Sequence, residues 1–193
     1  MSQANFLLRV LCATLVFMLL VAPSCQSAPR TFDINDKVKR DLVSFTSDAP
    51  LELIVGRTSN ITGTVTVDDS LDLTKPVQAR FEVDLASIDT GIALRNEHMR
   101  DNFLQTKMYP KATFVLKQLD NPPAELKDGQ KITLKGMGDF TVHGKTVTKK
   151  VSVDVTYKKR CPQTESNLAM SPAKAKGCDL LQLKTTFSVV FGD

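Results

Sequence analysis

The sequence predicts an all-β protein, an extended antiparallel barrel of about eight strands with a short helix near one end. Several segments alternate apolar and polar residues, most clearly residues 151–157. No segment is long enough to form a helix that covers a sheet, so the sheet must bury its apolar face against itself. Gly136 and Gly138 interrupt a long segment with one apolar face, as expected where a strand bends around a barrel.

The same alternation places the strands along the chain, although residues 38–45 fit no single pattern. Strands are expected over residues 31–34, 51–55, 61–67, 80–85, 114–116, 131–142, 151–157 and 181–191. Between two of them the chain breaks at Asp89-Thr90-Gly91, continues as a charged helix and turns at Tyr109-Pro110. This order indicates a barrel wall with a helical loop folded over one mouth.

The N-terminus has the pattern of a secretory signal peptide covering residues 1–27. An apolar run of about thirteen residues, Val10–Ala22, is too short to span a bilayer and is followed by small residues suited to cleavage. We therefore expect a secreted or periplasmic protein whose domain covers residues 28–193. The alternative is a protein anchored by lipid through Cys25.

Two cysteines remain in the expected domain after cleavage. Cys161 and Cys178 flank a loop rich in Pro, Ser and Lys. An exported protein meets an oxidising compartment, so these cysteines are expected to form a disulfide within an enlarged loop over residues 158–184. Closing such a loop contributes about 3 kcal/mol in the chain-entropy treatment.

Composition argues against several classes of function. The net charge of +4 is scattered, aromatic residues make up 6% and Trp is absent, which does not favour nucleic-acid binding. With only two His and no close Cys pair, neither a metal site nor a nucleophilic hydrolase is expected. We expect no catalytic residues and no cofactor.

The helical loop holds the one cluster of side chains that could bind a ligand or take part in a reaction. Two interpretations of this cluster stay open. In the first, Arg95 and His98 donate hydrogen bonds to an anionic headgroup at the barrel mouth. In the second, Asp89-Thr90 caps the helix, Arg95 is the ion-pair partner of this cap and His98 is a packing residue.

Three stretches of the chain resemble the YceI-like family of secreted, lipocalin-like proteins. They are VDLASIDTGIALRNEHMRDNFL (Val83–Leu104), MYPKATF (Met108–Phe114) and GDFTVHGKTVTKKVSVDV (Gly138–Val155). The resemblance implies an eight-stranded lipocalin-like barrel whose hydrophobic tunnel holds a polyisoprenoid, such as a polyprenyl phosphate or a quinone. It also implies one more strand than the chain provides before Asp193, so the final strand is expected to be missing and one sheet edge open.

The leading hypothesis is an exported, non-enzymatic protein that binds a long-chain isoprenoid or similar lipid for storage, transport or a stress response. Peripheral membrane contact is compatible with this function, and the oligomeric state is left open. The alternative is an envelope interaction module with a filled barrel and the cysteine loop as its recognition element. The residues expected at the ligand are Val65, Phe81, Val83, Leu85, Arg95, His98, Phe114, Leu134, Phe140, Val153 and Phe187.

Overall fold

A computed structural model describes residues 28–35, 38–49, 52–159 and 179–190. The expected signal peptide, Cys25 and the cysteine pair Cys161–Cys178 lie outside the described residues, so those expectations stay predictions.

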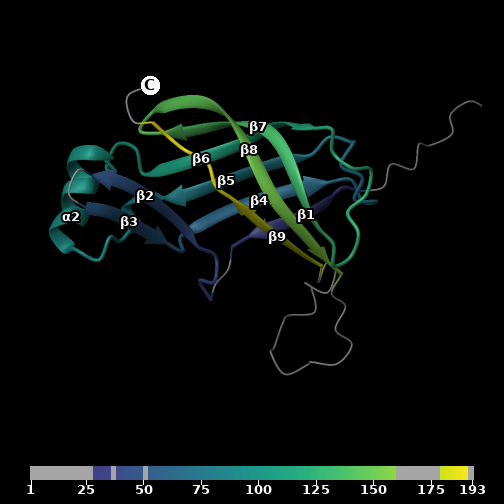
Figure 1. Cartoon of the computed structure of the whole chain (residues 1–193), viewed down its shortest axis with the longest axis horizontal. Coiled ribbons are helices and arrows are strands. Elements are labelled where there is room, and N and C mark those ends of the chain that lie inside the picture. Colours follow the sequence, from purple (N-terminus) through teal and green to yellow (C-terminus); the bar gives the residue numbers. More distant parts are fainter. Residues whose placement is uncertain (1–27, 36–37, 50–51, 160–178, 191–193) are drawn as a thin grey trace, which may run out of the picture.

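The described chain forms one antiparallel seven-stranded sheet that curls into a nearly closed barrel (Figure 1). The strands in sheet order are β1 (Arg30–Ile34), β4 (Ile61–Val67), β5 (Gln78–Asp84), β6 (Lys111–Asp120), β7 (Lys131–Val142), β8 (Lys145–Lys158) and β9 (Leu180–Thr185). A separate hairpin consists of β2 (Val43–Ala49) and β3 (Glu52–Thr58). The predicted barrel is confirmed, with seven strands in its sheet and two in the hairpin instead of about eight in one sheet.

Strands β7 and β8 are the longest and pair along the whole length of β7. The turn between them has positive φ at both central residues, 52° at His143 and 74° at Gly144, which matches the right-handed twist of the strands. Ile132, Leu134, Phe140 and Val142 share the inner face of β7 with Gly136 and Gly138, as the alternation predicts.

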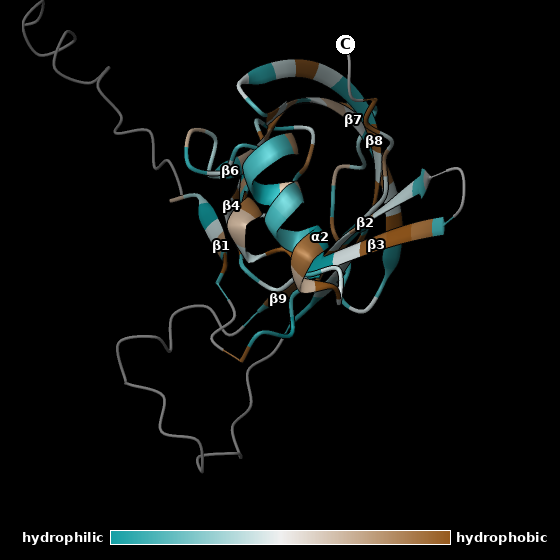
Figure 2. Ribbon diagram, turned by 90° about the vertical axis from the view of Figure 1, so that its left-hand side faces the viewer, coloured by the Kyte–Doolittle hydropathy of each residue, from teal (hydrophilic) through white to brown (hydrophobic). Residues whose placement is uncertain are grey.

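The connection between β5 and β6 forms the helical segment, which covers one end of the barrel (Figures 1 and 2). It contains a 3-10 turn (Leu85–Ser87), helix α2 (Ala93–His98) and a π-helical turn (Met99–Phe103). Met99 and Leu104 are buried and pack in one cluster with Phe140 and Val142 from the inner face of β7. The helical segment therefore closes this end of the barrel with its own apolar side chains.

Strands β1 and β9 are the two edges of the sheet, and polar side chains join them at one end. Arg30 donates through Nη1 to Asp179 Oδ2 at 2.7 Å, and the hydroxyl of Tyr157 donates to the same oxygen at 2.7 Å. The pKa of Tyr157 is raised to about 12, mainly because its ring is buried and secondly because its hydroxyl donates to the carboxylate of Asp179. These three residues hold the edges together without a backbone ladder between β1 and β9 in the described residues.

The expectation of a loop over the whole of residues 158–184 is wrong at both ends. Lys158 ends β8, and β9 begins at Leu180 because Leu181 and Leu183 alternate with polar residues and turn their side chains inward. After β9, residues 186–190 belong to no strand, although Phe187 and Val189 remain half-buried. The expected absence of a final strand stays a prediction.

Candidate functional site

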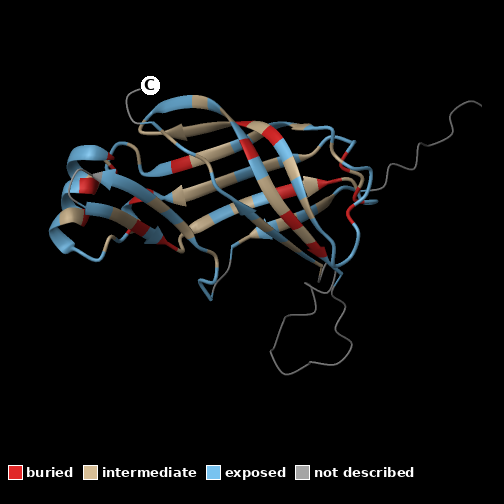
Figure 3. Cartoon of the chain, in the orientation of Figure 1, coloured by how far each residue is buried: buried red, intermediate tan, exposed pale blue. Residues whose placement is uncertain are grey.

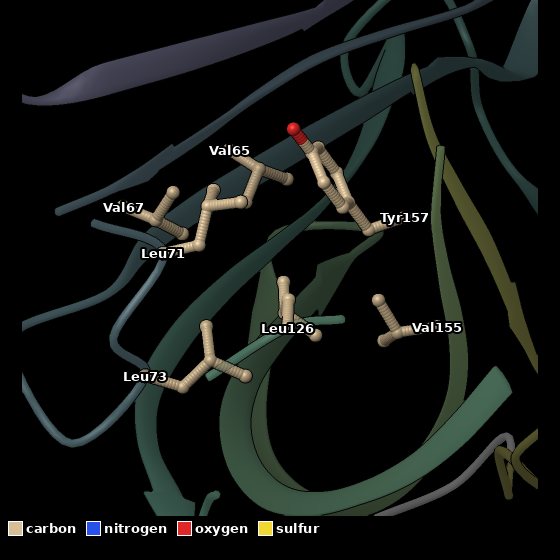
Figure 4. Close-up of a cluster of buried hydrophobic side chains, with 7 residues drawn as sticks. All are labelled: Val65, Val67, Leu71, Leu73, Leu126, Val155 and Tyr157. Atoms are coloured by element: carbon tan, nitrogen blue, oxygen red, sulfur yellow. The ribbon is translucent and has the colours of Figure 1, made fainter. Parts of the chain in front are cut away.

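Two apolar clusters fill the two ends of the barrel interior. The far-end cluster consists of Val65, Val67, Leu71, Leu73, Leu126, Val155 and Tyr157 (Figure 4). The helix-end cluster consists of Leu85, Ile88, Met99, Leu104 and Ala112. Buried positions accordingly lie at both ends of the barrel and along β8 (Figure 3). Any ligand inside the barrel must lie between these two clusters or displace part of one.

A cavity of about 80 Å³ lies between the strands, towards the far-end cluster. Its wall is apolar apart from Lys135, which is exposed at an outward-facing position of β7. In the described residues, every buried side-chain nitrogen or oxygen has a hydrogen-bond partner. The interior therefore offers dry apolar contact and leaves no buried polar atom in need of a ligand.

The cavity is smaller than a long-chain ligand requires. An apolar cavity of about 150 Å³ holds one benzene ring, and pockets for drug-sized ligands usually measure about 300–1,000 Å³. This cavity, lined by described residues, is therefore too small to be the continuous tunnel that the family resemblance implies. A long chain can enter only if side chains of the interior move.

The structure separates the predicted ligand residues into several groups. Five of them line the cavity: Val65, Phe81, Phe114, Leu134 and Val153. Leu85 belongs to the helix-end cluster, Phe140 packs against it, and Val83 is a half-buried residue of β5 outside both clusters. The period-two pattern thus identified wall residues, but it could not tell which part of the wall is hollow.

Phe187 lies between the cavity and the helix end of the barrel. Its ring centroid is 6.2 Å from that of Phe114, a residue of the cavity wall, and 5.2 Å from that of Phe140. Because Phe140 packs against the helix-end cluster, the Phe187 ring contacts both the cavity wall and a neighbour of that cluster. The side chain comes from residues 186–190, which no strand of the described structure pairs with.

Arg95 and His98 are not in the cavity wall. Arg95 Nη2 lies 2.7 Å from Glu52 Oε2 at the start of β3, and His98 is exposed on α2. The alternative pairing of Arg95 with the Asp89-Thr90 cap is wrong. Helix α2 instead begins after Ile92, which makes no side-chain capping bond.

Asn96 is a residue that sequence reasoning missed. It is buried, accepts from the backbone nitrogen of Thr90 at 2.8 Å, and donates through Nδ2 to Asp89 Oδ1 at 2.6 Å. The hydrogen bond from the backbone nitrogen of Gly91, together with that from Asn96, holds the pKa of Asp89 below its usual range. This network ties α2 to Asp89, whose backbone pairs with that of Arg57 on β3.

Sequence reasoning also missed wall residues that come from loops and from β9. Leu73 and Leu126 reach the cavity from the connections after β4 and β6. Leu126 is the one Leu in the loop NPPAELKDGQ, and Leu73 follows Leu71 by two residues in DDSLDLTKPV, and large apolar residues in such loops are the signal that could have identified them. Leu181 and Leu183 of β9 complete the wall.

The described residues show neither a metal-binding group nor a membrane-spanning helix. No three His, Cys, Asp or Glu side chains among them gather where they could hold a metal ion. None of their helices is long and apolar enough to cross a membrane.

Comparison with known proteins gives a family match. The model of the YceI-like domain matches residues 37–189. No curated protein matches the sequence of this chain.

Several solved structures resemble the chain at low identity. A polyisoprenoid binding domain from Saccharophagus degradans, implicated in plant cell wall breakdown, has 22% identity and a TM-score of 0.45, over 60% of this chain and 62% of that domain. BcnA of Burkholderia cenocepacia has 20% identity and a TM-score of 0.44, over 61% of this chain and 76% of that protein. The YCEI protein of Campylobacter jejuni has 14% identity and a TM-score of 0.34, over 83% of this chain and 85% of that protein. The chain thus covers less than two thirds of the Saccharophagus domain.

Proposed function

This chain belongs to the YceI-like domain family, and we propose that it binds a long-chain isoprenoid or a similar amphiphilic lipid inside its barrel. The observation that carries this proposal is a cavity with an almost wholly apolar wall in a barrel whose described buried polar groups are all satisfied. Its similarity to a polyisoprenoid binding domain agrees with this ligand class. The protein is proposed to act by binding alone, without catalysis, in storage, transport or a stress response.

Hydrophobic burial supplies the binding free energy in this proposal. Each methylene removed from water contributes about 0.8 kcal/mol, so a chain of ten carbons gains several kcal/mol even after side chains rearrange. Because the cavity measures only about 80 Å³, binding must widen it. The affinity is therefore the difference between the burial of the ligand and the cost of moving interior side chains.

We propose that the protein acts outside the cytoplasm, because its leader has the pattern of a signal peptide. The finer assignment to a secreted, a periplasmic or a Cys25-anchored form belongs to the same proposal. Fractionation of cells that express the full chain, with mass measurement of the mature N-terminus, distinguishes the three forms.

The substitution Ala79→Phe tests the binding function directly. Ala79 lines the cavity opposite Val65, its partner on β4, so a phenyl ring at this position fills the space meant for the ligand. We expect organic extraction and mass spectrometry to find lipid on the wild-type protein, or to find uptake of added farnesol. The variant is expected to hold none.

Gln78→Phe is the matched control, because Gln78 is the neighbour of Ala79 on β5 and its side chain is exposed. It places the same ring outside the barrel and should leave uptake unchanged. Overpacking at position 79 costs about 1–3 kcal/mol, so circular dichroism must show that the variant is folded. A wild-type protein with neither extractable lipid nor farnesol uptake contradicts the proposed function.

We propose further that the helical end of the barrel contacts a lipid bilayer, from which a poorly soluble ligand would come. Large apolar side chains are exposed there, including Leu94 at 61% and Phe103 at 73%. Leu53, on β3, is 61% exposed and follows Glu52, which the ion pair with Arg95 holds beside α2. Figure 2 shows this end, with the apolar strand β3 beside the helical segment.

Removing the apolar groups at this end should weaken membrane binding. We expect the double variant Leu94→Ser, Phe103→Ser to bind phosphatidylcholine vesicles at least about tenfold more weakly in sedimentation, because burying one such side chain contributes about 1.5–3 kcal/mol. Leu180→Ser is the control, since Leu180 is also exposed but begins β9 away from the helical segment (Figure 1). Equal loss in both variants, or no vesicle binding by the wild type, would contradict this contact.

The small cavity favours one alternative, an envelope interaction module with a filled barrel. In that case the cysteine loop, which lies outside the described residues, would recognise a partner. Replacing Cys161 and Cys178 by Ser would then abolish partner capture in a crosslinking assay while Ala79→Phe had no effect. If the barrel binds lipid, only the Ala79→Phe variant should show a defect.

A further inference from the structure

Lys149 occupies a position on the inner face of the barrel wall. Along β8, Val147, Lys149 and Val151 alternate with the exposed residues Thr148 and Lys150. Lys149 pairs with Gly138, which lies on the inner face of β7. Since successive side chains of a strand point to opposite faces, the stem of Lys149 leaves β8 on the apolar side.

This lysine differs from every other lysine in the described residues. Lys149 is half-buried, whereas all the others are exposed. Some lysines on the outer face have carboxylate partners, such as Lys117 with Asp139 at 2.9 Å and Lys131 with Asp154 at 2.8 Å, so what sets Lys149 apart is its burial on the inner face. No carboxylate of the described chain lies within ion-pair distance of Lys149.

The position also lies beside the cavity and next to an unpaired stretch of sheet. Val151, the next inward residue along β8, lines the cavity, as does Gly136, its partner on β7. Strand β9 pairs with β8 only from Val153 onward, so among the described residues β7 is the one strand that pairs with β8 at Lys149. A half-buried lysine can lay its apolar stem along the wall and extend its ammonium group towards water, where a headgroup can reach it.

We propose that Lys149 binds the anionic headgroup, a phosphate or a carboxylate, of an amphiphilic lipid whose chain occupies the barrel interior. This inference rests on the proposed lipid-binding function and specifies its ligand class. A compact ammonium with three donors suits a phosphate or a carboxylate, and partial burial strengthens the contact. The cation sets the preference for an anionic lipid, while the apolar wall provides most of the affinity.

Two lipids with one chain and different heads test this inference. Isothermal titration calorimetry with farnesyl phosphate and with farnesol measures the effect of the charge alone. We expect the wild type to prefer farnesyl phosphate by roughly ten- to hundredfold, the range for a hydrogen bond to a charged group. Lys149→Met should bind farnesol as the wild type does and lose this preference, while Lys149→Arg should keep most of it.

Lys150→Met is the matched control, because Lys150 is exposed on the outer face of the same strand. It removes an equal charge one residue away and should keep the preference for farnesyl phosphate. Equal affinity of the wild type for both lipids, or an unchanged preference in Lys149→Met, overturns the role of Lys149 but leaves lipid binding intact. Failure of the wild type to bind either lipid overturns both this inference and the proposed function.

Discussion

Gly136→Ala is expected to lower the free energy of unfolding by about 1–2 kcal/mol. A Cβ at this position would lie 2.5 Å from the backbone oxygen of Gln118 and 3.2 Å from a methyl carbon of Leu119. The oxygen belongs to the β6 backbone, so no rotamer change can relieve the contact. Overpacking of this kind costs about 1–3 kcal/mol or more, and the lost chain entropy of glycine offsets up to about 1 kcal/mol of it.

The close approach has a structural cause in β6. The register between β6 and β7 shifts between Leu116 and Gln118, immediately before Leu119, which is the partner of Gly136. A bulge bends the strand, and here it accompanies an approach of the Gln118 carbonyl to Gly136 that leaves no room for a Cβ. Urea denaturation, followed by circular dichroism, measures the effect through the transition midpoint.

Gly129→Ala separates this effect from the conformational freedom of glycine. Gly129 has φ of 73° but nothing within 4 Å of a Cβ, so alanine there meets only backbone strain of about 1 kcal/mol. If Gly136→Ala proved no more destabilising than Gly129→Ala, the close contact between β6 and β7 would be contradicted.

The sequence predicts the strands of the barrel wall well, because each strand has one face in water and one face in the core. The alternation of Val65 and Val67 with Thr64 and Thr66 follows from this difference and needs no knowledge of the neighbouring strand. The pairing of Lys149 with Gly138 also follows from the turn at His143-Gly144. The inward position of Lys149 could therefore have been found from the sequence.

Contacts between distant segments could not be predicted in this way. Alternation gives no information about the ion pair between Arg95 and Glu52, because the two residues come from separate elements that meet only in the folded protein. The closure of the barrel end by Leu73 and Leu126 depends on how two loops fold back. The size of the cavity depends on all of these contacts together, and only the structure shows that it is small.

Phe187→Ala is expected to connect the cavity with the helix end of the barrel and to increase the affinity for long chains. In the wild type, a chain that fills the cavity meets the Phe187 ring, which packs between Phe114 and Phe140. Moving this ring reduces the observed affinity by the cost of the rearrangement. Alanine removes that cost, while the loss of a half-buried ring lowers the free energy of unfolding by about 1–3 kcal/mol.

A series of isoprenoid alcohols of increasing length, titrated against both proteins, measures the effect. For the wild type, we expect the gain in affinity per carbon to fall once the chain reaches Phe187. For the variant, the gain should continue near about 0.8 kcal/mol per methylene over the longer alcohols. Phe103→Ala is the control, since Phe103 is 73% exposed and outside the interior. The same length dependence in the Phe187→Ala variant and the wild type would show that the ring does not limit the site. The ligand would then have to enter from the far end, where Leu71, Leu73 and Leu126 lie.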